Sequence, residues 1–162
     1  MIYVFEGIEG AGKTTAARRY AESNGLKVFV DPSRHMPRVE GRTAAEWKLL
    51  GNQTNLHVAS FAMIADFVVD RWALSSMVYD SMRGDCLPDK FYQEIAAETP
   101  AIVFVLDISP TTALERLREK HDPRNIDLQY LESAAVRYLH AADKWDRWGG
   151  DCRVYQGDPW KL

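Results

Sequence analysis

The sequence predicts an α/β fold, a three-layer αβα sandwich in which helices cover both faces of a parallel sheet of about five strands. Two observations lead to this prediction. Short apolar runs alternate with helix-forming segments along the whole chain. These runs lack the polar alternation of half-exposed strands, as expected when both faces of a sheet are covered. The length, 162 residues, suits a single domain with a hydrophobic core, so we expect residues 1–162 to form one unit.

The first elements are a strand, a loop and a helix. Residues 2–5 (IYVF) are strand formers and predict the first buried strand. A glycine-rich loop separates them from a predicted helix over Lys13–Asn24, which Gly25 ends. Lys27–Val30 (KVFV) predicts the second strand. Residues 31–43 contain prolines and several arginines, and therefore predict a loop.

The middle of the chain continues the alternation. We expect helices at 44–50 and 55–64, interrupted near Gly51. Residues 67–69 (FVV) predict a short buried strand, and a helix is expected at 74–82.

The last third contains the clearest core strand, residues 101–106 (AIVFVL). Ser109 and Pro110 mark the start of the helix that follows it. A polar loop at 121–125 then precedes a long helix. The other elements expected here are helices at 89–97, 111–120 and 127–145 and a last strand at 153–155.

Composition excludes several classes of protein. The net charge of −3 argues against a dedicated nucleic-acid binder, which usually carries a basic excess. Cys86 and Cys152 belong to no metal-binding motif, so we expect no structural zinc and a reducing, cytoplasmic location. We expect no signal peptide, because the first residues lack a basic segment followed by a long apolar stretch. The longest apolar stretch, FAMIADFVV, is short and contains Asp66, so no membrane span is expected.

The loop GIEGAGKT matches the P-loop pattern, with a strand before it and a helix after it. Its glycines permit a nest of backbone N–H groups around a phosphate, and the following helix adds its positive end. Lys13 is expected to reach the β- and γ-phosphates, and the Thr14 hydroxyl to ligate Mg²⁺. ATP with Mg²⁺ is the predicted ligand. The residues expected to bind it are Gly7, Glu9, Gly10, Ala11, Gly12, Lys13, Thr14 and Thr15.

Polar residues that follow strands are the other site candidates, since ligands bind beyond the carboxyl ends of parallel strands. Asp70 is expected to support Mg²⁺ through water, and Arg71 to hold a second phosphate or a carboxylate. An ion pair that closes the sheet end is the alternative for both. Asp31 also follows a strand. For Asp107 a structural role is at least as well supported as a functional one.

A basic segment, ERLREKHDPRN, predicts a lid around residues 116–126. Phosphoryl transfer needs positive charge around the transferred group, and a mobile lid can supply it and exclude water. Arg116, Arg118, Lys120 and Arg124 carry this charge, and Arg116 also suits a structural role. A solvated charged helix face is the alternative interpretation of the segment.

Three segments together resemble the thymidylate kinases: FEGIEGAGKTT, DRWALSSMVYD and FVLDISPTTALERLREKHDPRN. The resemblance covers roughly three quarters of the chain, and the combination of segments is more specific than the loop alone. It implies that Lys13, Thr14 and the loop amides bind ATP–Mg²⁺, that Arg71 holds the acceptor phosphate and that Asp70 supports the metal. Glu9 would face the acceptor sugar, with Tyr79 near it.

The resemblance also implies roles for the lid, for Asp31 and for residues 156–158, and it implies an assembly. The P-loop has Gly10 and Ala11 where one subgroup of the family has an arginine, so the arginine that stabilises the transition state should come from the lid, as Arg118 or Arg124. Asp31 stands where the family tends to have glutamate, on the acceptor side. Residues 156–158 would lie near adenine. A homodimer is the assembly that the family favours.

This sequence departs from the family's pattern where the family recognises thymine. Phe61 is expected to stack on the acceptor base, but the arginine four residues later in the family's pattern is missing. In an apolar helix, however, such a phenylalanine is more often a core residue. Asn52, Gln53 and Asn55 are alternative polar partners for the base.

The leading function is therefore that of a P-loop kinase that moves the γ-phosphoryl group of ATP to a deoxynucleoside monophosphate, with dTMP as the expected acceptor. One alternative keeps the kinase and changes the acceptor to a hydroxyl group, on a nucleoside or on a modified base in DNA, with Asp70 or Glu9 as general base. DNA is the less favoured partner. Another alternative is a nucleotide-binding switch without transfer activity.

Overall fold

The computed structural model describes residues 1–30, 44–84 and 87–157, and its centre is a fully parallel sheet. The sheet has five strands in the order β2-β3-β1-β4-β5. Their bounds are Ile2–Glu6 for β1, Lys27–Val30 for β2, Phe67–Asp70 for β3, Ala101–Asp107 for β4 and Asp151–Gln156 for β5.

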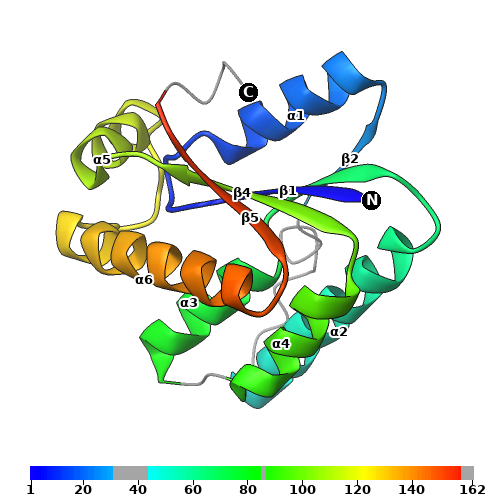
Figure 1. The fold of residues 1–162 in the computed structure, drawn as a ribbon. Coiled ribbons are helices and arrows are strands. Elements are labelled where there is room, and N and C mark those ends of the chain that lie inside the picture. The colour runs from blue at the N-terminus through cyan, green and yellow to red at the C-terminus, as the bar shows by residue number, and fades with distance from the viewer. Residues whose placement is uncertain (31–43, 85–86, 158–162) are drawn as a thin grey trace.

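Helices lie on both sides of this sheet, with α1 on one side and α2, α3, α4 and α6 on the other (Figure 1). Their bounds are Lys13–Asn24 for α1, Ala44–Ala62 for α2, Ala73–Arg83 for α3, Asp89–Glu98 for α4, Pro110–Glu119 for α5 and Leu128–Arg147 for α6. The predicted α/β sandwich is confirmed. In the described part of the chain, none of the helices is both long and apolar enough to cross a bilayer.

The strand β1 lies at the centre, paired with β3 on one side and β4 on the other. Val4 stands level with Val69 and Val103, and all three side chains are buried. Because the strands are parallel, their carboxyl ends meet at one edge of the sheet. That edge brings Glu6, at the end of β1, beside Asp70, at the end of β3.

The helix α2 corrects one prediction. It runs through Gly51 without the expected interruption, and it ends at Ala62 rather than at residue 64. A glycine inside a helix costs only about 1 kcal/mol relative to alanine, which packing can offset. Here Val58 and Ala62 are buried, and the Asn55 carbonyl oxygen accepts a hydrogen bond from Trp72 Nε1 at 3.1 Å. Tertiary contacts thus hold the helix together where the local sequence predicts a break.

Other helix ends follow local signals. Ser109 caps α5 by accepting a hydrogen bond from the Thr112 amide at 3.1 Å, and Pro110 is its first residue. Asp127 caps α6 in the same way through the Tyr130 amide at 2.7 Å. These caps are typical of helix N-termini and place the segment between α5 and α6 next to the P-loop edge of the sheet.

Candidate active site

The phosphate loop, residues 7–12, connects β1 to α1 and is held against two neighbouring elements. Gly7 has φ of +135°, and a Cβ atom there would lie 2.7 Å from the Leu106 carbonyl oxygen of β4. Gly10 has φ of +77°, and a Cβ atom there would overlap the Ala113 carbonyl oxygen of α5. The α1 N-cap, Gly12, provides no side-chain cap. The positive end of α1 is therefore available to a phosphate group.

Lys13 folds back over this loop. Its Nζ donates a hydrogen bond to the Ile8 carbonyl oxygen at 2.5 Å, and the side chain is buried. Burial, and then the nearby Arg71 guanidinium, lower the pKa of Lys13 well below its ordinary value. Negative phosphate oxygens would reverse both effects, because they favour the charged ammonium form.

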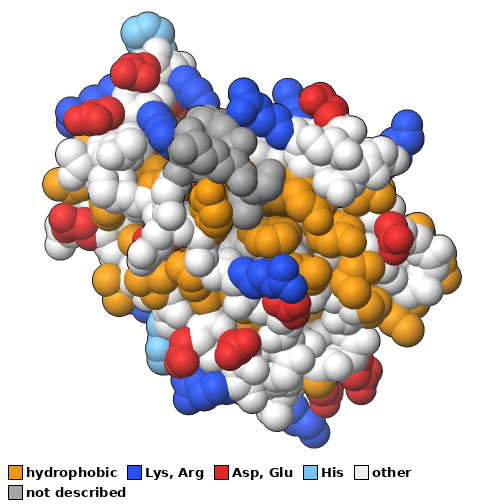
Figure 2. Space-filling model, turned by 45° about the horizontal axis from the view of Figure 1, so that its top comes forward, with side chains coloured by type: hydrophobic (Ala, Val, Ile, Leu, Met, Phe, Trp, Pro, Cys, Tyr) orange, Lys and Arg blue, Asp and Glu red, His pale blue; other side chains and the backbone are white. Residues whose placement is uncertain are grey.

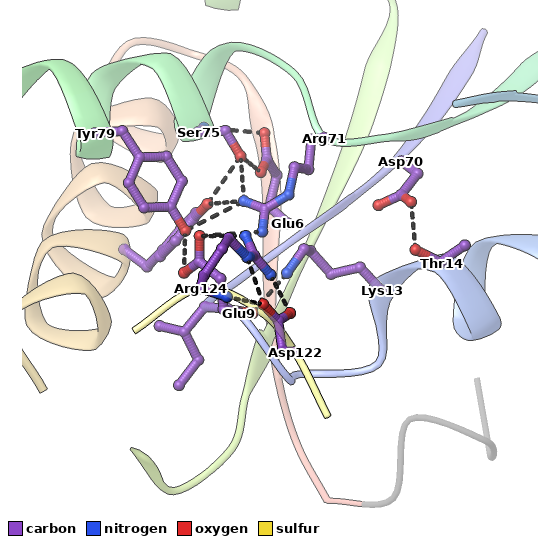
Figure 3. A network of polar contacts seen from close by, with 12 residues as sticks. Glu6, Glu9, Lys13, Thr14, Asp70, Arg71, Ser75, Tyr79, Asp122 and Arg124 are labelled. Atoms are coloured by element: carbon purple, nitrogen blue, oxygen red, sulfur yellow. Dashed lines mark hydrogen bonds and ion pairs between the residues drawn. The ribbon is translucent and has the colours of Figure 1, made fainter. Parts of the chain in front are cut away.

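Thr14 and Asp70 bring two hard oxygen ligands together. The Thr14 hydroxyl donates to Asp70 Oδ2 at 2.6 Å, and the Asp70 carboxylate is fully buried at the end of β3 (Figure 3). Hydroxyl and carboxylate oxygens are the ligands that Mg²⁺ prefers, and Mg²⁺ in kinase sites completes its coordination with phosphates and water. This donor pair fits a nucleotide-bound Mg²⁺.

Arg71 is held in an unusual conformation directly after β3. Its φ is +76°, a left-handed value that costs a residue with a side chain roughly 1–2 kcal/mol. Its amide donates to the Phe5 carbonyl oxygen at 3.1 Å. The guanidinium Nη1 donates to three hydroxyl oxygens, those of Ser75 at 3.3 Å, Tyr79 at 3.2 Å and Tyr138 at 3.3 Å. A buried cation is therefore fixed beside the phosphate loop, largely by neutral partners.

Glu9 lies inside the loop and faces this cation. Its Oε1 is 3.6 Å from Arg71 Nη2, and its Oε2 accepts a hydrogen bond from the Tyr79 hydroxyl at 2.7 Å. Burial raises the pKa of Tyr79, so its hydroxyl stays neutral at physiological pH. Glu9 therefore contacts Arg71 at Nη2, whereas Tyr79 and Ser75 both accept hydrogen bonds from Nη1.

The predicted lid contributes one arginine to the polar cluster that Arg71 forms with Glu9, Ser75, Tyr79 and Tyr138. Arg124 Nη1 lies 3.9 Å from Glu9 Oε1. The same guanidinium forms two hydrogen bonds with Asp122, from Nε to Oδ1 at 2.9 Å and from Nη2 to Oδ2 at 2.7 Å. These bonds lower the pKa of Asp122 to about 2. Arg118, by contrast, is exposed on α5.

Comparison with known proteins agrees with the kinase-like geometry of this site. A family model described as thymidylate kinase matches residues 52–148. A probable thymidylate kinase of Methanococcus vannielii is 31% identical over 144 residues, which are 78% of this chain and 71% of the relative. One from Sulfurisphaera tokodaii is 31% identical over 159 residues, which are 88% and 82% of the two chains. The chain belongs to the thymidylate kinase family. It is a P-loop kinase of the nucleotide kinase group, as predicted.

Solved structures show the same fold at lower identity. The YorR protein of Bacillus subtilis, in complex with phosphorylated GDP, has a TM-score of 0.69 and 19% identity, over 98% of this chain and 86% of that one. Deoxyadenosine kinase of M. mycoides with bound dATP has a TM-score of 0.64 and 17% identity, over 98% and 93%. The fold of this thymidylate kinase family member is therefore shared with proteins of distant sequence, one of them a deoxyadenosine kinase.

Not every expected residue of the kinase joins the cluster. Phe61 is half exposed in the last turn of α2, and the next residue, Ala62, accepts a hydrogen bond from the Met1 amino group at 3.3 Å. That places Phe61 near the amino end of β1, away from the phosphate loop. Asn55 is buried and donates to Ser76 Oγ at 3.0 Å, so its side chain serves packing. Asp31 lies outside the described residues.

Three residues of the kinase cluster are absent from the sequence-based expectations: Glu6, Ser75 and Tyr138. Glu6 had a local signal, because it is an acid at the end of an apolar strand and directly precedes Gly7. Ser75 lies in the segment that resembles the family, where a hydroxyl is easily assigned to the helix surface. Tyr138 had no local signal, because it reaches the cluster from the middle of α6.

Proposed function

We propose that this kinase transfers the γ-phosphoryl group of ATP to the phosphate of dTMP. The observation that carries the proposal is the buried Arg71 guanidinium beside the phosphate loop. Its Nη1 hydrogen bonds go to neutral hydroxyls, and its nearest ion-pair distance, to Glu9, is 3.6 Å. A buried arginine of this kind favours binding of a dianionic phosphate, which guanidinium groups hold through charge-assisted, often paired hydrogen bonds.

The remaining residues supply positioning and charge. Lys13 and the loop amides hold the β- and γ-phosphates, and Thr14 and Asp70 would hold Mg²⁺, which neutralises phosphate charge when it is bound. Arg124, within 3.9 Å of Glu9, would supply positive charge to the transferred group from the predicted lid. An acceptor phosphate is already ionised near neutral pH, so no strong general base is required. The chain therefore acts by aligning two phosphates and balancing their charge.

The choice of acceptor rests on family membership and on surface charge. The relatives in the two archaea are named probable thymidylate kinases, and this supports dTMP as the acceptor. On the face drawn in Figure 2, basic side chains gather along the upper rim with acidic side chains among them, and hydrophobic side chains gather at the centre. A stripe of basic charge is the usual footprint of a DNA-binding surface. Acidic side chains interrupt this rim and the net charge of the chain is −3, which favours a small nucleotide over DNA.

One phosphotransfer panel tests this function. The purified protein is incubated with γ-labelled ATP and Mg²⁺ and with dTMP, the other deoxynucleoside monophosphates, thymidine or single-stranded DNA. We expect label in dTDP at the highest kcat/KM of the panel. Preferential labelling of thymidine or DNA would replace the phosphate acceptor with a hydroxyl acceptor. No labelling of any acceptor would overturn the proposed transfer reaction.

Arginine variants test the assignment within the site. Arg71→Ala should lower kcat/KM for dTMP by about 100-fold or more, because a paired charge-assisted interaction with phosphate is worth roughly 3 kcal/mol. Arg147→Ala is the matched control, since Arg147 is an exposed residue at the end of α6, paired with Asp143. Equal effects of the two substitutions would exclude Arg71 as the acceptor-phosphate ligand. Comparing Arg124→Ala with Arg118→Ala identifies the lid arginine, and we expect Arg124→Ala to lower kcat more.

A further inference from the structure

Glu6 is a buried acid beside the phosphate loop, and its hydrogen bonds go to the start of α3 rather than to the loop. Its side chain is fully buried at the end of β1. One carboxylate oxygen, Oε1, accepts hydrogen bonds from the Trp72 amide at 2.7 Å and the Ser75 amide at 3.1 Å. The other, Oε2, accepts the Ser75 hydroxyl at 2.5 Å. Burial raises the pKa of Glu6, so these three donors have to offset a desolvation penalty that a neutral residue would avoid.

The backbone donors show what Glu6 holds in place. Trp72 is the N-cap of α3 and makes no side-chain cap of its own, and Ser75 is the third helical residue. The amide of that position is the one that a capping side chain usually satisfies. Glu6 therefore caps α3 from another element, the central strand. Arg71 stands just before this cap, and its own amide is bonded to Phe5, the neighbour of Glu6.

The hydroxyl donor shows how Glu6 reaches the Arg71 side chain. Because the Ser75 hydroxyl donates its hydrogen bond to Glu6, the Ser75 oxygen is left with lone pairs for Arg71 Nη1 at 3.3 Å and for Tyr138 at 2.8 Å. Tyr138 can then donate to Ser75 and still accept from Arg71 Nη1 at 3.3 Å. Glu9 acts likewise on Tyr79, whose hydroxyl donates its hydrogen bond to Glu9 Oε2. Two carboxylates thus make the hydroxyls around Arg71 act as acceptors (Figure 3).

We propose that Glu6 is a positioning residue for the acceptor phosphate: its charge fixes the direction of the Ser75–Tyr138 hydrogen bonds and thereby the Arg71 guanidinium. This inference rests on the proposed function, because it assumes that Arg71 holds the acceptor phosphate. Nη1 is committed to the hydroxyl acceptors, so the rest of the guanidinium is presented to the ligand in one orientation. Such support around a binding side chain is what makes a site geometrically precise.

Glu6→Gln changes charge and hydrogen-bond direction with little change in shape. The two backbone amides remain donors, so the amide oxygen of the glutamine has to face them. Its NH₂ group then faces the Ser75 oxygen, so the Ser75 hydroxyl can no longer donate to residue 6. The Ser75 proton has to turn toward Arg71 or Tyr138, which are themselves hydrogen-bond donors to Ser75. We expect the KM for dTMP to rise about tenfold, the size of effect typical for a hydrogen bond to a charged group. The KM for ATP should change less than about twofold, because Glu6 is the weakest of the charges that act on the pKa of Lys13 and its hydrogen bonds go to Trp72 and Ser75.

A control variant and a double-mutant cycle with Arg71→Ala separate a positioning role of Glu6 from general destabilisation. Glu98→Gln makes the same chemical change at an exposed residue at the end of α4 and should leave both KM values unchanged. In an Arg71→Ala background, Glu6→Gln should lower kcat/KM for dTMP by less than about twofold more, because its effect acts through Arg71. Tyr138→Phe removes one of the three hydroxyl oxygens that accept from Arg71 Nη1 and should raise the KM for dTMP. This variant tests the proposal if Glu6→Gln does not fold.

The outcomes distinguish this inference from the proposed function. If the wild-type protein phosphorylates dTMP and Glu6→Gln raises the KM values for dTMP and ATP equally, or its effect adds fully to that of Arg71→Ala, the positioning role is overturned and the function stands. The same holds if Glu6→Gln does not fold and Tyr138→Phe leaves the KM for dTMP unchanged. If the wild-type protein phosphorylates no monophosphate, both proposals are overturned.

Discussion

The packing of the phosphate loop against α5 gives a prediction whose size follows from the structure. In Gly10→Ala the new side chain meets two costs. The φ of +77° is worth roughly 1–2 kcal/mol for a residue with a Cβ atom. The overlap with the Ala113 carbonyl oxygen, backed by the Ala113 carbonyl carbon at 3.0 Å, adds about 1–3 kcal/mol because a backbone group is displaced. We expect a total of about 3 kcal/mol, which in a protein of this size lowers Tm by about 6–12 °C.

Gly25→Ala is the matched control for this substitution. Gly25 has a similar φ, +65°, but a Cβ atom there would meet nothing within 4 Å. It should lose only the conformational part, about 1–2 kcal/mol, or about 2–8 °C in Tm. Thermal and urea unfolding of both variants measure the difference, and ATP–Mg²⁺ should raise the Tm of Gly10→Ala less than that of Gly25→Ala. Equal losses in the two variants would refute the inference that α5 packs tightly on the phosphate loop.

Three further predictions concern the nucleotide side and the lid. Burial lowers the pKa of Lys13 below its ordinary value of 10.5. At a pH between the lowered pKa and the ordinary one, binding of ATP should therefore be accompanied by uptake of a proton. Calorimetry in buffers of different ionisation enthalpy would detect this proton, and Lys13→Arg should show no uptake. Thr14→Val should weaken ATP binding with Mg²⁺ at least about tenfold and hardly change it without Mg²⁺; equal losses would exclude a metal role. Asp122 has a pKa lowered to about 2, so its bond to Arg124 is complete above the unfolded value of about 4 and is lost as the pH falls through 2. Asp122→Asn should speed amide exchange in the lid and change stability by less than about 1 kcal/mol, because the pair is exposed; unchanged exchange would argue against this pair as the restraint on Arg124.

Much of the fold could be predicted because its signals are local. The strand at 101–106 and the capped start of α5 are contiguous patterns, and both are found where the sequence indicated. The break near Gly51 was wrong because the local preference of one glycine is smaller than the stabilisation from Val58 and Ala62, whose burial no local pattern reveals. The single domain, the homodimer and the cytoplasmic location stay predictions.

The site divides in the same way. Phe61 was a reasonable candidate because an aromatic side chain in a helix can stack on a base, but the direction of α2 carries it toward the opposite edge of the sheet. Arg71 was predicted because parallel strands end at one edge, which is a property of topology that the alternation of elements already implies. Glu6 was missed because its partners are 66 to 69 residues away along the chain.

The sequence by itself determined that a phosphate nest follows the first strand, because the backbone conformation of such a loop is set by its own glycines and by the helix that follows it. Tertiary structure decided how the arginine beside that nest is held. Arg71, Ser75 and Tyr138 come from β3's end, α3 and α6, and Glu6 joins them from β1. The direction of a hydroxyl proton depends on the charges that surround it in space, and only the folded chain brings those charges together.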